Sequence, residues 1–454
     1  MYSFLIKNMK KIIIGVLALA VVLGVAFWMF APTLFGPKEE PIKEITLSMY
    51  GLWESEELLK PAIDEYKKLH PNITIKYEFN RSTNYRTKVQ TRIANNDPQR
   101  PDIFILHNSW LPMFVNSGLV TPVPASVLSY ADFTRSFYPI VKDTLSANNQ
   151  IYALPRGIDG LALYYNPELL EAKGINVPTN WKELADAAAA AAVTDDEGNL
   201  QVGGLAIGIP GNVDHWSDIL GLLFLQLPGS SLEKPNDEGR LGEEVLRYFT
   251  SLATGRETNG IVLWDKTMPA STDAFAEKRL AFYIAPSWRA SELRQKNPEL
   301  KFGIAPMPQL PGQSIVNWGT FWAYGVSSTS QYPQEAWEFV NFLTSAETQV
   351  LLYGEASNSR LFGLPYSRTE LKEQVIDDPF VGPFIKQSDT YKSWYLNSGT
   401  FDQGINDNII KYYEDGINGI VDLGKEPNAV LGTIQDGVQQ ELGKYAPQPA
   451  VTTQ

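Results

Sequence analysis

The clearest alternation of apolar and polar residues follows an N-terminal apolar stretch. It predicts strands at Lys43–Met49 and Ile73–Phe79, and an apolar run predicts a third at Asp102–Leu106. Between them, apolar residues at helical spacing predict helices from about Ser55 to Leu69 and from Tyr85 to Asn95. Strands that alternate with helices favour a parallel sheet with right-handed crossovers. Ligands of such sheets bind just beyond the carboxyl ends of the strands.

Several aromatic and polar side chains fall at these strand ends. Trp53 and Glu54 follow the first strand, and His107, Asn108 and Trp110 follow the third. We therefore take Trp53, Glu54, Asn108 and Trp110 as candidates for ligand contact. Glu54 has a second explanation, because acidic residues are also favoured at helix starts by the helix dipole.

The segment Gln150–Ile175 organises the rest of the chain. Ile151–Leu154 predicts a strand ended by Pro155, and Leu161–Tyr165 predicts a second strand after the polar joint Arg156–Gly160. Two such strands fit either one sheet that turns a corner or a chain that passes between two lobes. The alternating elements on both sides favour two lobes, which close on a small ligand.

The remaining chain continues this alternation of strands and helices. Asn180 with Glu183 predicts a capping box at the start of a helix, and Thr344 with Glu347 predicts another. A further strand is predicted at Leu205–Ile209.

The chain contains 11 tryptophans, several of them beside glycine, proline or polar residues. Buried packing is the usual role of tryptophan, but this setting indicates that some of them line a cleft. The polar loop Gly211–His215 leads to Trp216 at a predicted helix start, which makes Trp216 a candidate for ligand contact.

Composition excludes several classes of function. A chain of 454 residues is long enough for two or more lobes, and its net charge of −13 disfavours nucleic acid as a partner. The absence of cysteine excludes disulfides, thiolate metal sites, a cysteine nucleophile and a lipid-modified cysteine. His70, His107 and His215 are too scattered for a typical zinc site. We therefore predict neither a metal nor a cofactor.

The N-terminal stretch predicts a membrane anchor. Lys7, Lys10 and Lys11 precede the uncharged apolar run Ile12–Phe30, which is long enough to span a bilayer. A cleaved signal peptide is the alternative, but this run is longer than usual and ends in bulky residues instead of a small-x-small cleavage site. The predicted order is a cytoplasmic segment at 1–11, a membrane helix at 12–30 and a tether at 31–41.

Four blocks of sequence resemble one known family, the extracellular solute-binding proteins of ABC importers, in its maltose-binding-like sugar group (family 1). The blocks are Pro101–Val123 (PDIFILHNSWLPMFVNSGLVTPV), Tyr152–Leu184, Ala274–Pro308 with its APSW and FGIAPMP motifs, and Trp318–Glu347. The resemblance covers nearly everything after residue 42. One departure is the missing lipid-modified cysteine, whose tethering role a membrane helix can fill.

The resemblance implies an α/β fold of two lobes, the periplasmic-binding-protein-like fold of type II. Each lobe is expected to be a mainly parallel sheet flanked by helices, and the lobes are expected to close by hinge bending. Crossing segments are expected near Pro155–Ile158, Ile315–Gly319 and Gly363–Pro365. The expected boundaries are 42–156 and 318–364 for lobe 1, 157–317 and 365–446 for lobe 2, and 447–454 for a flexible tail.

The resemblance also implies a function and further site residues. It implies a monomeric, membrane-anchored protein on the extracytoplasmic side, which captures a sugar or oligosaccharide and delivers it to an ABC permease without catalysing a reaction. Trp288 matches the family's stacking tryptophan, Asp159 matches a polar contact, and Trp318 and Trp394 resemble further stacking positions. Arg156, Arg360 and Tyr366 lie at crossings, where they contact the ligand or brace the joint.

Three other functions are compatible with parts of this pattern. A glycoside hydrolase would need two paired carboxylates, and no motif pairs them, so we predict that the protein is not an enzyme. The same fold with arginines near the joints would suit an anionic or phosphorylated polyol. A sensory or scaffold binding protein without an importer is the third alternative.

Overall fold

The computed structural model describes residues 2–35, 43–236, 239–256 and 258–445. The chain forms two compact units, one up to Ile45 and one from Thr46 onward. Residues 36–41 of the predicted tether and the predicted tail at 447–454 lie outside the described residues.

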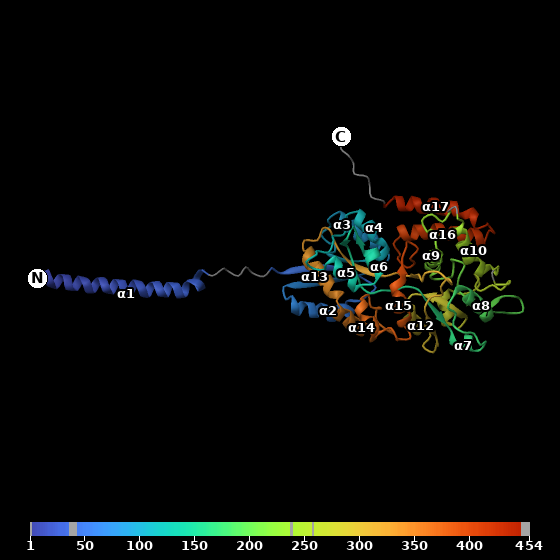
Figure 1. Ribbon diagram of the computed structural model, residues 1–454, viewed down its shortest axis with the longest axis horizontal. Coiled ribbons are helices and arrows are strands. Elements are labelled where there is room, and N and C mark those ends of the chain that lie inside the picture. Colours follow the sequence, from blue (N-terminus) through green and yellow to red (C-terminus); the bar gives the residue numbers. More distant parts are fainter. Residues whose placement is uncertain (1, 36–42, 237–238, 257, 446–454) are drawn as a thin grey trace, which may run out of the picture. The chain divides into compact units, whose positions relative to one another are not determined.

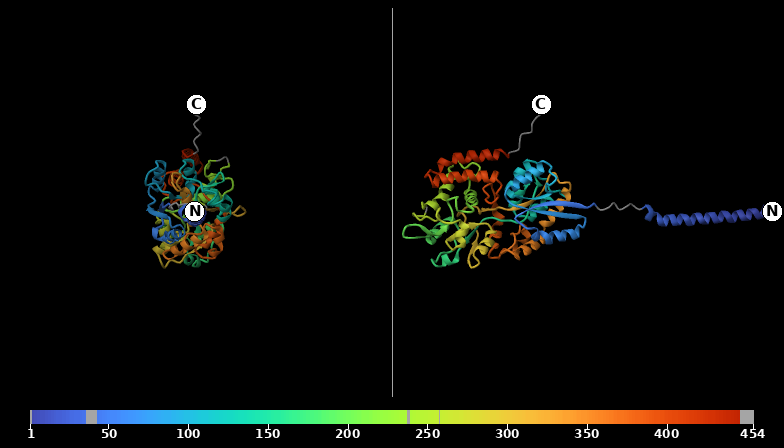
Figure 2. Two further views of the ribbon diagram at one scale, coloured as in Figure 1. Left: turned by 90° about the vertical axis from the view of Figure 1, so that its left-hand side faces the viewer. Right: turned by 180° about the vertical axis from the view of Figure 1, so that it is seen from behind.

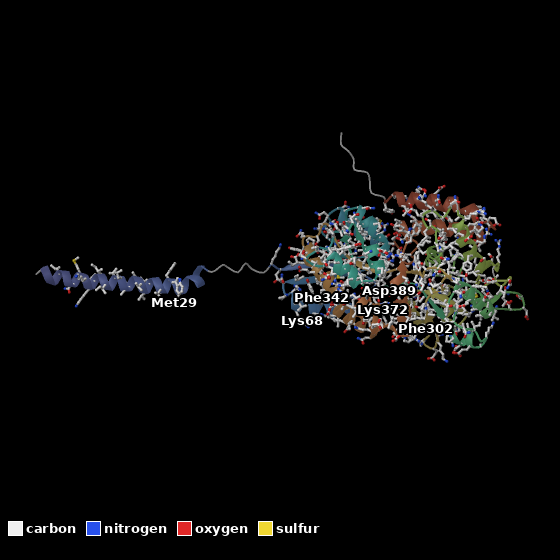
Figure 3. The ribbon with its side chains drawn as sticks, in the orientation of Figure 1. Met29, Lys68, Phe302, Phe342, Lys372 and Asp389 are labelled. Atoms are coloured by element: carbon white, nitrogen blue, oxygen red, sulfur yellow. The ribbon has the colours of Figure 1, made fainter. Side chains whose placement is uncertain are left out.

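The first unit contains one long helix, α1 (Tyr2–Phe35). Its segment Asn8–Met29 has a mean hydropathy of 2.8 and is long and apolar enough to cross a membrane, a property that signal sequences share. The helix continues through residues 31–35, which the sequence pattern assigned to a tether. Side chains stand out along α1, among them Met29, and none of those in the apolar segment is buried (Figure 3).

The first sheet of the second unit has the strand order β2-β1-β3-β13-β6. β1 and β3 run parallel, with Met49 opposite Ile103, so their carboxyl ends lie at one edge of the sheet. β13 runs antiparallel to both β3 and β6. The bounds of these strands are β1 Ile45–Leu52, β2 Ile73–Asn80, β3 Ile103–His107, β6 Leu154–Pro155 and β13 Trp322–Val326.

Helices flank this first sheet, and we call the sheet with its helices lobe 1. α2 (Glu56–Leu69) buries Leu59, Ala62 and Tyr66, the helically spaced apolar positions predicted from the sequence. Figure 1 labels α2, α3 and α13 on the side of the molecule that holds this sheet. The other elements here are α3 Tyr85–Ala94, η1 Asn108–Trp110, α4 Leu111–Asn116, α5 Tyr130–Ser136, α6 Pro139–Leu145, β4 Ser146–Ala147, β5 Gln150–Ile151, α13 Pro333–Leu343 and α14 Ala346–Ser357.

The second sheet has the order β11-β7-β10-β9-β8. β10 runs parallel to β9 but antiparallel to β7, and β11 is also antiparallel to β7. The expectation of a mainly parallel sheet is wrong here, because β7 enters from the other lobe and runs against its neighbours. The bounds are β7 Ala162–Tyr165, β8 Val193–Thr194, β9 Leu200–Leu205, β10 Leu280–Ala285 and β11 Gly303–Ala305.

Two strand predictions are corrected. The strand expected at Leu205–Ile209 lies earlier, because Gly203 and Gly204 belong to β9. A Cβ on Gly204 would lie 2.1 Å from the Ala188 carbonyl oxygen, so glycine there allows a helix to pack closely. The single strand expected at Ile151–Leu154 is two short strands, of which β5 pairs with β4 and β6 joins the first sheet.

The helices around the second sheet complete lobe 2, and Figure 2 shows them grouped together when the molecule is seen from behind. At the start of α8, the Glu183 N–H donates to Asn180 Oδ1 at 2.9 Å, which confirms Asn180 as the cap, and the Glu183 side chain accepts from the Thr179 N–H at 2.8 Å. The second capping prediction is wrong by one residue, because Ser345 and not Thr344 caps α14. The bounds are α7 Pro167–Glu171, α8 Trp181–Ala191, α9 Trp216–Gln226, α10 Leu241–Thr254, α11 Ser271–Ala276, α12 Arg289–Lys296, α15 Gly382–Gln387, α16 Ile405–Val421 and α17 Asn428–Gly443.

The chain passes between the lobes in three segments. We call residues 156–161, between β6 and β7, the first crossing; 306–321, between β11 and β13, the second; and 358–381, between α14 and α15, the third. The second contains β12 (Asn317–Trp318), which pairs with β14 (Tyr391–Lys392). The short 3-10 helices η2 (Thr369–Gln374) and η3 (Ser388–Thr390) complete the described elements.

The three crossings lie side by side. The Ile158 N–H of the first donates to the Pro365 carbonyl of the third at 2.9 Å, and the Leu161 N–H donates to the Trp318 carbonyl of the second at 3.1 Å. A Cβ on Gly160 would lie 2.2 Å from that Trp318 carbonyl oxygen, so only glycine permits this approach.

Candidate functional site

The carboxyl edge of the first sheet presents one exposed indole ring. Trp53 follows β1 directly, is 41% exposed, and has a φ of 70°, a left-handed conformation that is uncommon for a large side chain. Its ring lies edge-to-face against Trp322, with ring centroids 5.7 Å apart, and Trp322 in turn contacts Trp110 at 5.2 Å. Strained residues of this kind cluster at functional sites, so Trp53 is the leading candidate for ligand contact in lobe 1.

Two of the other three candidates at this edge, Asn108 and Trp110, lie inside the protein. Trp110 is buried against Trp322, and Asn108 is buried with its amide in use. The Asn108 Nδ2 donates to Ser393 Oγ at 2.9 Å, and its Oδ1 accepts from the Phe321 N–H at 3.2 Å. Trp110 therefore supports Trp322, on which the Trp53 ring rests, and Asn108 holds the backbone of the preceding residue, Phe321.

Glu54 forms an ion-pair triad with two arginines from different crossings. Its Oε1 lies 3.3 Å from Arg156 Nη2 of the first crossing and accepts from Arg360 Nη1 of the third at 3.1 Å, while Arg360 Nη2 binds Oε2. Burial disfavours the charged carboxylate, but the two guanidinium groups outweigh it and hold the pKa of Glu54 below its usual value. Three predicted contact residues thus brace the joint, the second of the two roles expected for the arginines.

A cavity of about 30 Å³ adjoins this triad. Among the residues that the structure describes, the buried Arg156 Nε has no hydrogen-bond partner, and the cavity beside it has room for water. Tyr366, also predicted as a contact residue, is buried nearby with its ring 4.9 Å from that of Tyr353.

In lobe 2 the corresponding carboxylate is Asp159 of the first crossing. Its Oδ1 accepts from the Ser287 N–H at 3.0 Å and the Gly160 N–H at 2.7 Å, and its Oδ2 accepts from Ser287 Oγ at 2.8 Å. Burial raises the pKa of Asp159 to about 7, although these hydrogen bonds favour the charged form. The carboxylate therefore binds the loop that precedes Trp288.

Trp288 presents the second exposed indole ring. It is 48% exposed, its ring lies edge-to-face against His215 at 5.8 Å, and the Arg289 guanidinium lies 4.2 Å from its centroid. Arg289 Nε donates to His215 Nε2 at 3.0 Å, so the neutral histidine carries its proton on Nδ1 and donates to Ser398 Oγ at 2.9 Å. Polar contacts thus hold both residues that touch the ring.

Two further predicted tryptophans, Trp318 of the second crossing and Trp216 of lobe 2, are largely or wholly enclosed. Trp318 is fully buried, and its indole N–H donates to Asp218 Oδ1 at 2.8 Å. Its ring fills the space beside Gly221, where a Cβ would lie 2.4 Å away. Trp216 is also buried, at the start of α9. In this conformation neither ring presents a face to a ligand.

Residues 393–404, which we call the connecting segment, contact both lobes. On the lobe 1 side, Asp402 pairs with Arg86 at 3.7 Å, and the ring of Phe401 lies 6.2 Å from that of Trp53. On the lobe 2 side, the Ser398 N–H donates to the Asp218 carboxylate at 3.2 Å. The predicted residue Trp394 lies half-buried in this segment against Tyr395.

Of the candidates for ligand contact that the sequence predicted, only some are exposed in the structure. Trp53 and Trp288 are exposed on different lobes, and the first crossing and the connecting segment join them. Sequence reasoning missed Phe401, which is 55% exposed with a φ of 48°. The available signal was a lone aromatic residue in a polar loop between Gly399 and Gly404. No cluster of His, Asp and Glu suited to a metal ion occurs among the described residues.

Two α/β lobes, three adjacent crossings and an exposed aromatic ring on each lobe define a two-domain solute-binding fold of the periplasmic type. The chain belongs to the bacterial extracellular solute-binding protein family, whose profile matches residues 53–350. This result confirms the family resemblance and the two-lobed fold expected from the sequence.

Individual relatives are distant. A Brucella abortus protein named as a binding protein is 25% identical over 290 residues, which cover 62% of this chain and 68% of that protein. The maltotriose-binding protein of Pyrococcus abyssi is 21% identical over 302 residues, covering 64% of this chain and 60% of that protein. The solved sugar-binding protein MalE of Xanthomonas citri is 18% identical, with a TM-score of 0.71 over 88% of this chain and 98% of that one.

Proposed function

We propose that this protein captures a neutral sugar or oligosaccharide between its two lobes and presents it to the membrane subunits of an ABC importer. The observation that carries the proposal is the pair of exposed indole rings, Trp53 on lobe 1 and Trp288 on lobe 2. Sugars have apolar CH faces that stack on aromatic rings, and hydroxyl groups that bind charged or amide side chains. The names of the sugar-binding relatives support the same ligand class.

Lobe closure is the proposed mechanism, and no covalent step is involved. The crossings act as the hinge, and closure brings Trp53 and Trp288 onto opposite faces of the ligand. A ligand stabilises the closed form only by the extra affinity that it has for that form. The permease then recognises the closed lobes, and the binding protein works as a monomer.

The environment of the arginines favours a neutral ligand over an anionic or phosphorylated polyol. Arg156 and Arg360 both face Glu54, and Arg289 binds Glu292 at 2.6 Å. An anion would have to displace these carboxylates and leave buried charge unpaired, which costs several kcal/mol per ion.

Calorimetry with full-length protein in detergent tests this proposal. The panel contains neutral mono- and oligosaccharides, including maltotriose, and phosphorylated polyols. Micromolar binding of a neutral sugar that weakens in Trp53→Ala and Trp288→Ala supports the proposal, and binding of anions alone contradicts it. Leu423→Ala is the control, because Leu423 is 72% exposed and follows the far end of α16, whose 17 residues separate it from the connecting segment.

We further propose that α1 anchors the protein, with the lobes outside the cell. Its apolar segment of 22 residues, Asn8–Met29, supports this role, because it carries no charge after Lys11, and Lys10 and Lys11 near its start favour a cytoplasmic N-terminus. Mass spectrometry of protein extracted from membranes is expected to find the first 30 residues retained. A mature protein that begins after this helix would contradict the anchor. Reconstitution with its permease distinguishes import from a sensory or scaffold role.

A further inference from the structure

The first crossing carries two charged side chains three residues apart, Arg156 and Asp159, and each binds a different lobe. Arg156 pairs with Glu54 in lobe 1, and Asp159 binds Ser287 in lobe 2. Glu54 directly follows Trp53, and Ser287 directly precedes Trp288. Both exposed tryptophans are therefore next in sequence to a residue that the same short segment holds.

In lobe 1, Arg156 restrains Trp53 by two routes. Its side chain pairs with Glu54, which fixes the backbone beside the left-handed Trp53. Its backbone N–H donates to the Trp322 carbonyl at 3.0 Å, and Trp322 is the residue on which the Trp53 ring rests. One residue thus sets both the backbone position and the packing surface of the exposed ring.

In lobe 2, Asp159 restrains Trp288 through the loop that joins β10 to α12. Both carboxylate oxygens bind Ser287, one through the backbone N–H and one through Oγ. The Asp159 carbonyl also accepts from the Thr320 N–H of the second crossing at 2.9 Å, which fixes Asp159 itself. Oδ1 thus accepts two hydrogen bonds and Oδ2 accepts one, and all three donors belong to the first crossing or to the loop before Trp288.

We propose that Arg156 and Asp159 are positioning residues, which orient Trp53 and Trp288 from the hinge instead of contacting the ligand. The inference rests on the proposed function, in which these two rings bind the sugar. Three residues of chain span at most about 10 Å, so the first crossing fixes how the two rings are presented to each other. When this segment bends during closure, the positions of both rings change at the same time.

Fluorine NMR of the full chain in detergent tests the inference without any ligand. The protein is labelled with 5-fluorotryptophan, and the Trp53 and Trp288 signals are assigned with Trp53→Phe and Trp288→Phe. Asp159→Ala is expected to shift the Trp288 signal and leave the Trp53 signal in place. Arg156→Gln, which leaves Glu54 paired with Arg360, is expected to shift the Trp53 signal and leave the Trp288 signal in place.

Two conservative variants serve as controls. Asp159→Asn keeps an oxygen for both backbone N–H donors and is expected to restore the Trp288 signal. Glu441→Gln removes another buried paired carboxylate, on α17, and is expected to move neither signal. Shifts that are absent, or equal at both tryptophans, would overturn the inference. The NMR result does not depend on sugar binding, so it stands apart from failure of the proposed function.

Discussion

The two lobes hold their exposed tryptophans with different electrostatics. In lobe 1, Glu54 beside Trp53 is paired with two guanidinium groups, and its pKa lies below the usual value despite burial. In lobe 2, Asp159 behind Trp288 has hydrogen bonds only, and no lysine or arginine pairs with it in the described part of the chain. Its pKa is raised to about 7 by burial.

The first crossing is therefore bound to lobe 1 by an ion pair and to lobe 2 by hydrogen bonds. A paired carboxylate stays charged at neutral pH, but removal of its charge leaves two arginines without a counter-charge. A carboxylate held by hydrogen bonds alone costs less to remove, but it titrates near neutral pH. We therefore expect lobe 1 to be sensitive to mutation and lobe 2 to be sensitive to pH.

The largest expected effect is on stability. Glu54→Ala leaves Arg156 buried without its counter-charge, and the free energy of unfolding is expected to fall by about 3 kcal/mol. Urea denaturation followed by fluorescence measures this change. Arg360→Gln is the control and is expected to cost about 1 kcal/mol, because Arg360 is partly exposed and Arg156 keeps its partner. Equal losses in both variants would contradict the paired brace.

The second effect is on ligand affinity. Trp288→Ala is expected to weaken sugar binding about tenfold, from loss of about 1.5 kcal/mol of stacking. If Asp159 acts only through Trp288, the double variant Asp159→Ala with Trp288→Ala binds nearly as well as Trp288→Ala alone. Calorimetry with the sugar identified from the panel measures the cycle. If the losses of affinity in the two single variants multiply in the double variant, Asp159 contacts the ligand directly.

The third effect is on pH dependence. Asp159 has a pKa near 7 when folded and near 4 when unfolded, so between these values the folded state holds the additional proton. Its contribution to stability is complete below about pH 4 and is lost as pH rises through about 7. Tyr164 and Tyr391 face it and stay neutral, because burial raises their pKa values.

Asp159→Asn isolates this contribution, since it keeps the shape of the side chain and cannot ionise. From pH 5 to 8, the unfolding free energy of the natural protein is expected to fall relative to this variant by at most about 1.4 kcal/mol per pH unit. Denaturation at each pH measures the difference. Parallel curves would show that Asp159 keeps an ordinary pKa.

The smallest effect concerns the connecting segment. Phe401→Ala removes the ring beside Trp53 and is expected to weaken sugar binding about threefold, from about 0.6 kcal/mol of aromatic contact. Calorimetry with the panel sugar measures it. A loss as large as that of Trp288→Ala would move the centre of the site toward the connecting segment.

Local patterns predicted most of the fold. The α2 periodicity, the Asn180 cap and the strand before Trp53 were predicted because each depends on neighbours in sequence. The errors arose where distant chain decides the outcome. Gly203 and Gly204 lie within β9 because Trp264 packs against the first and α8 against the second, and β7 runs antiparallel because it enters from lobe 1.

The sequence by itself determined the elements, the family and the positions from which the site residues come, because periodicity and motif spacing are properties of neighbouring residues. Only the tertiary structure decided that Trp53 and Trp288 are exposed while Trp110 and Trp318 are buried. It also showed the protein partners of Glu54, Arg156 and Asp159, from which we propose that Arg156 and Asp159 position the tryptophans. The physical reason is that exposure and charge pairing depend on residues that are brought together from distant parts of the chain.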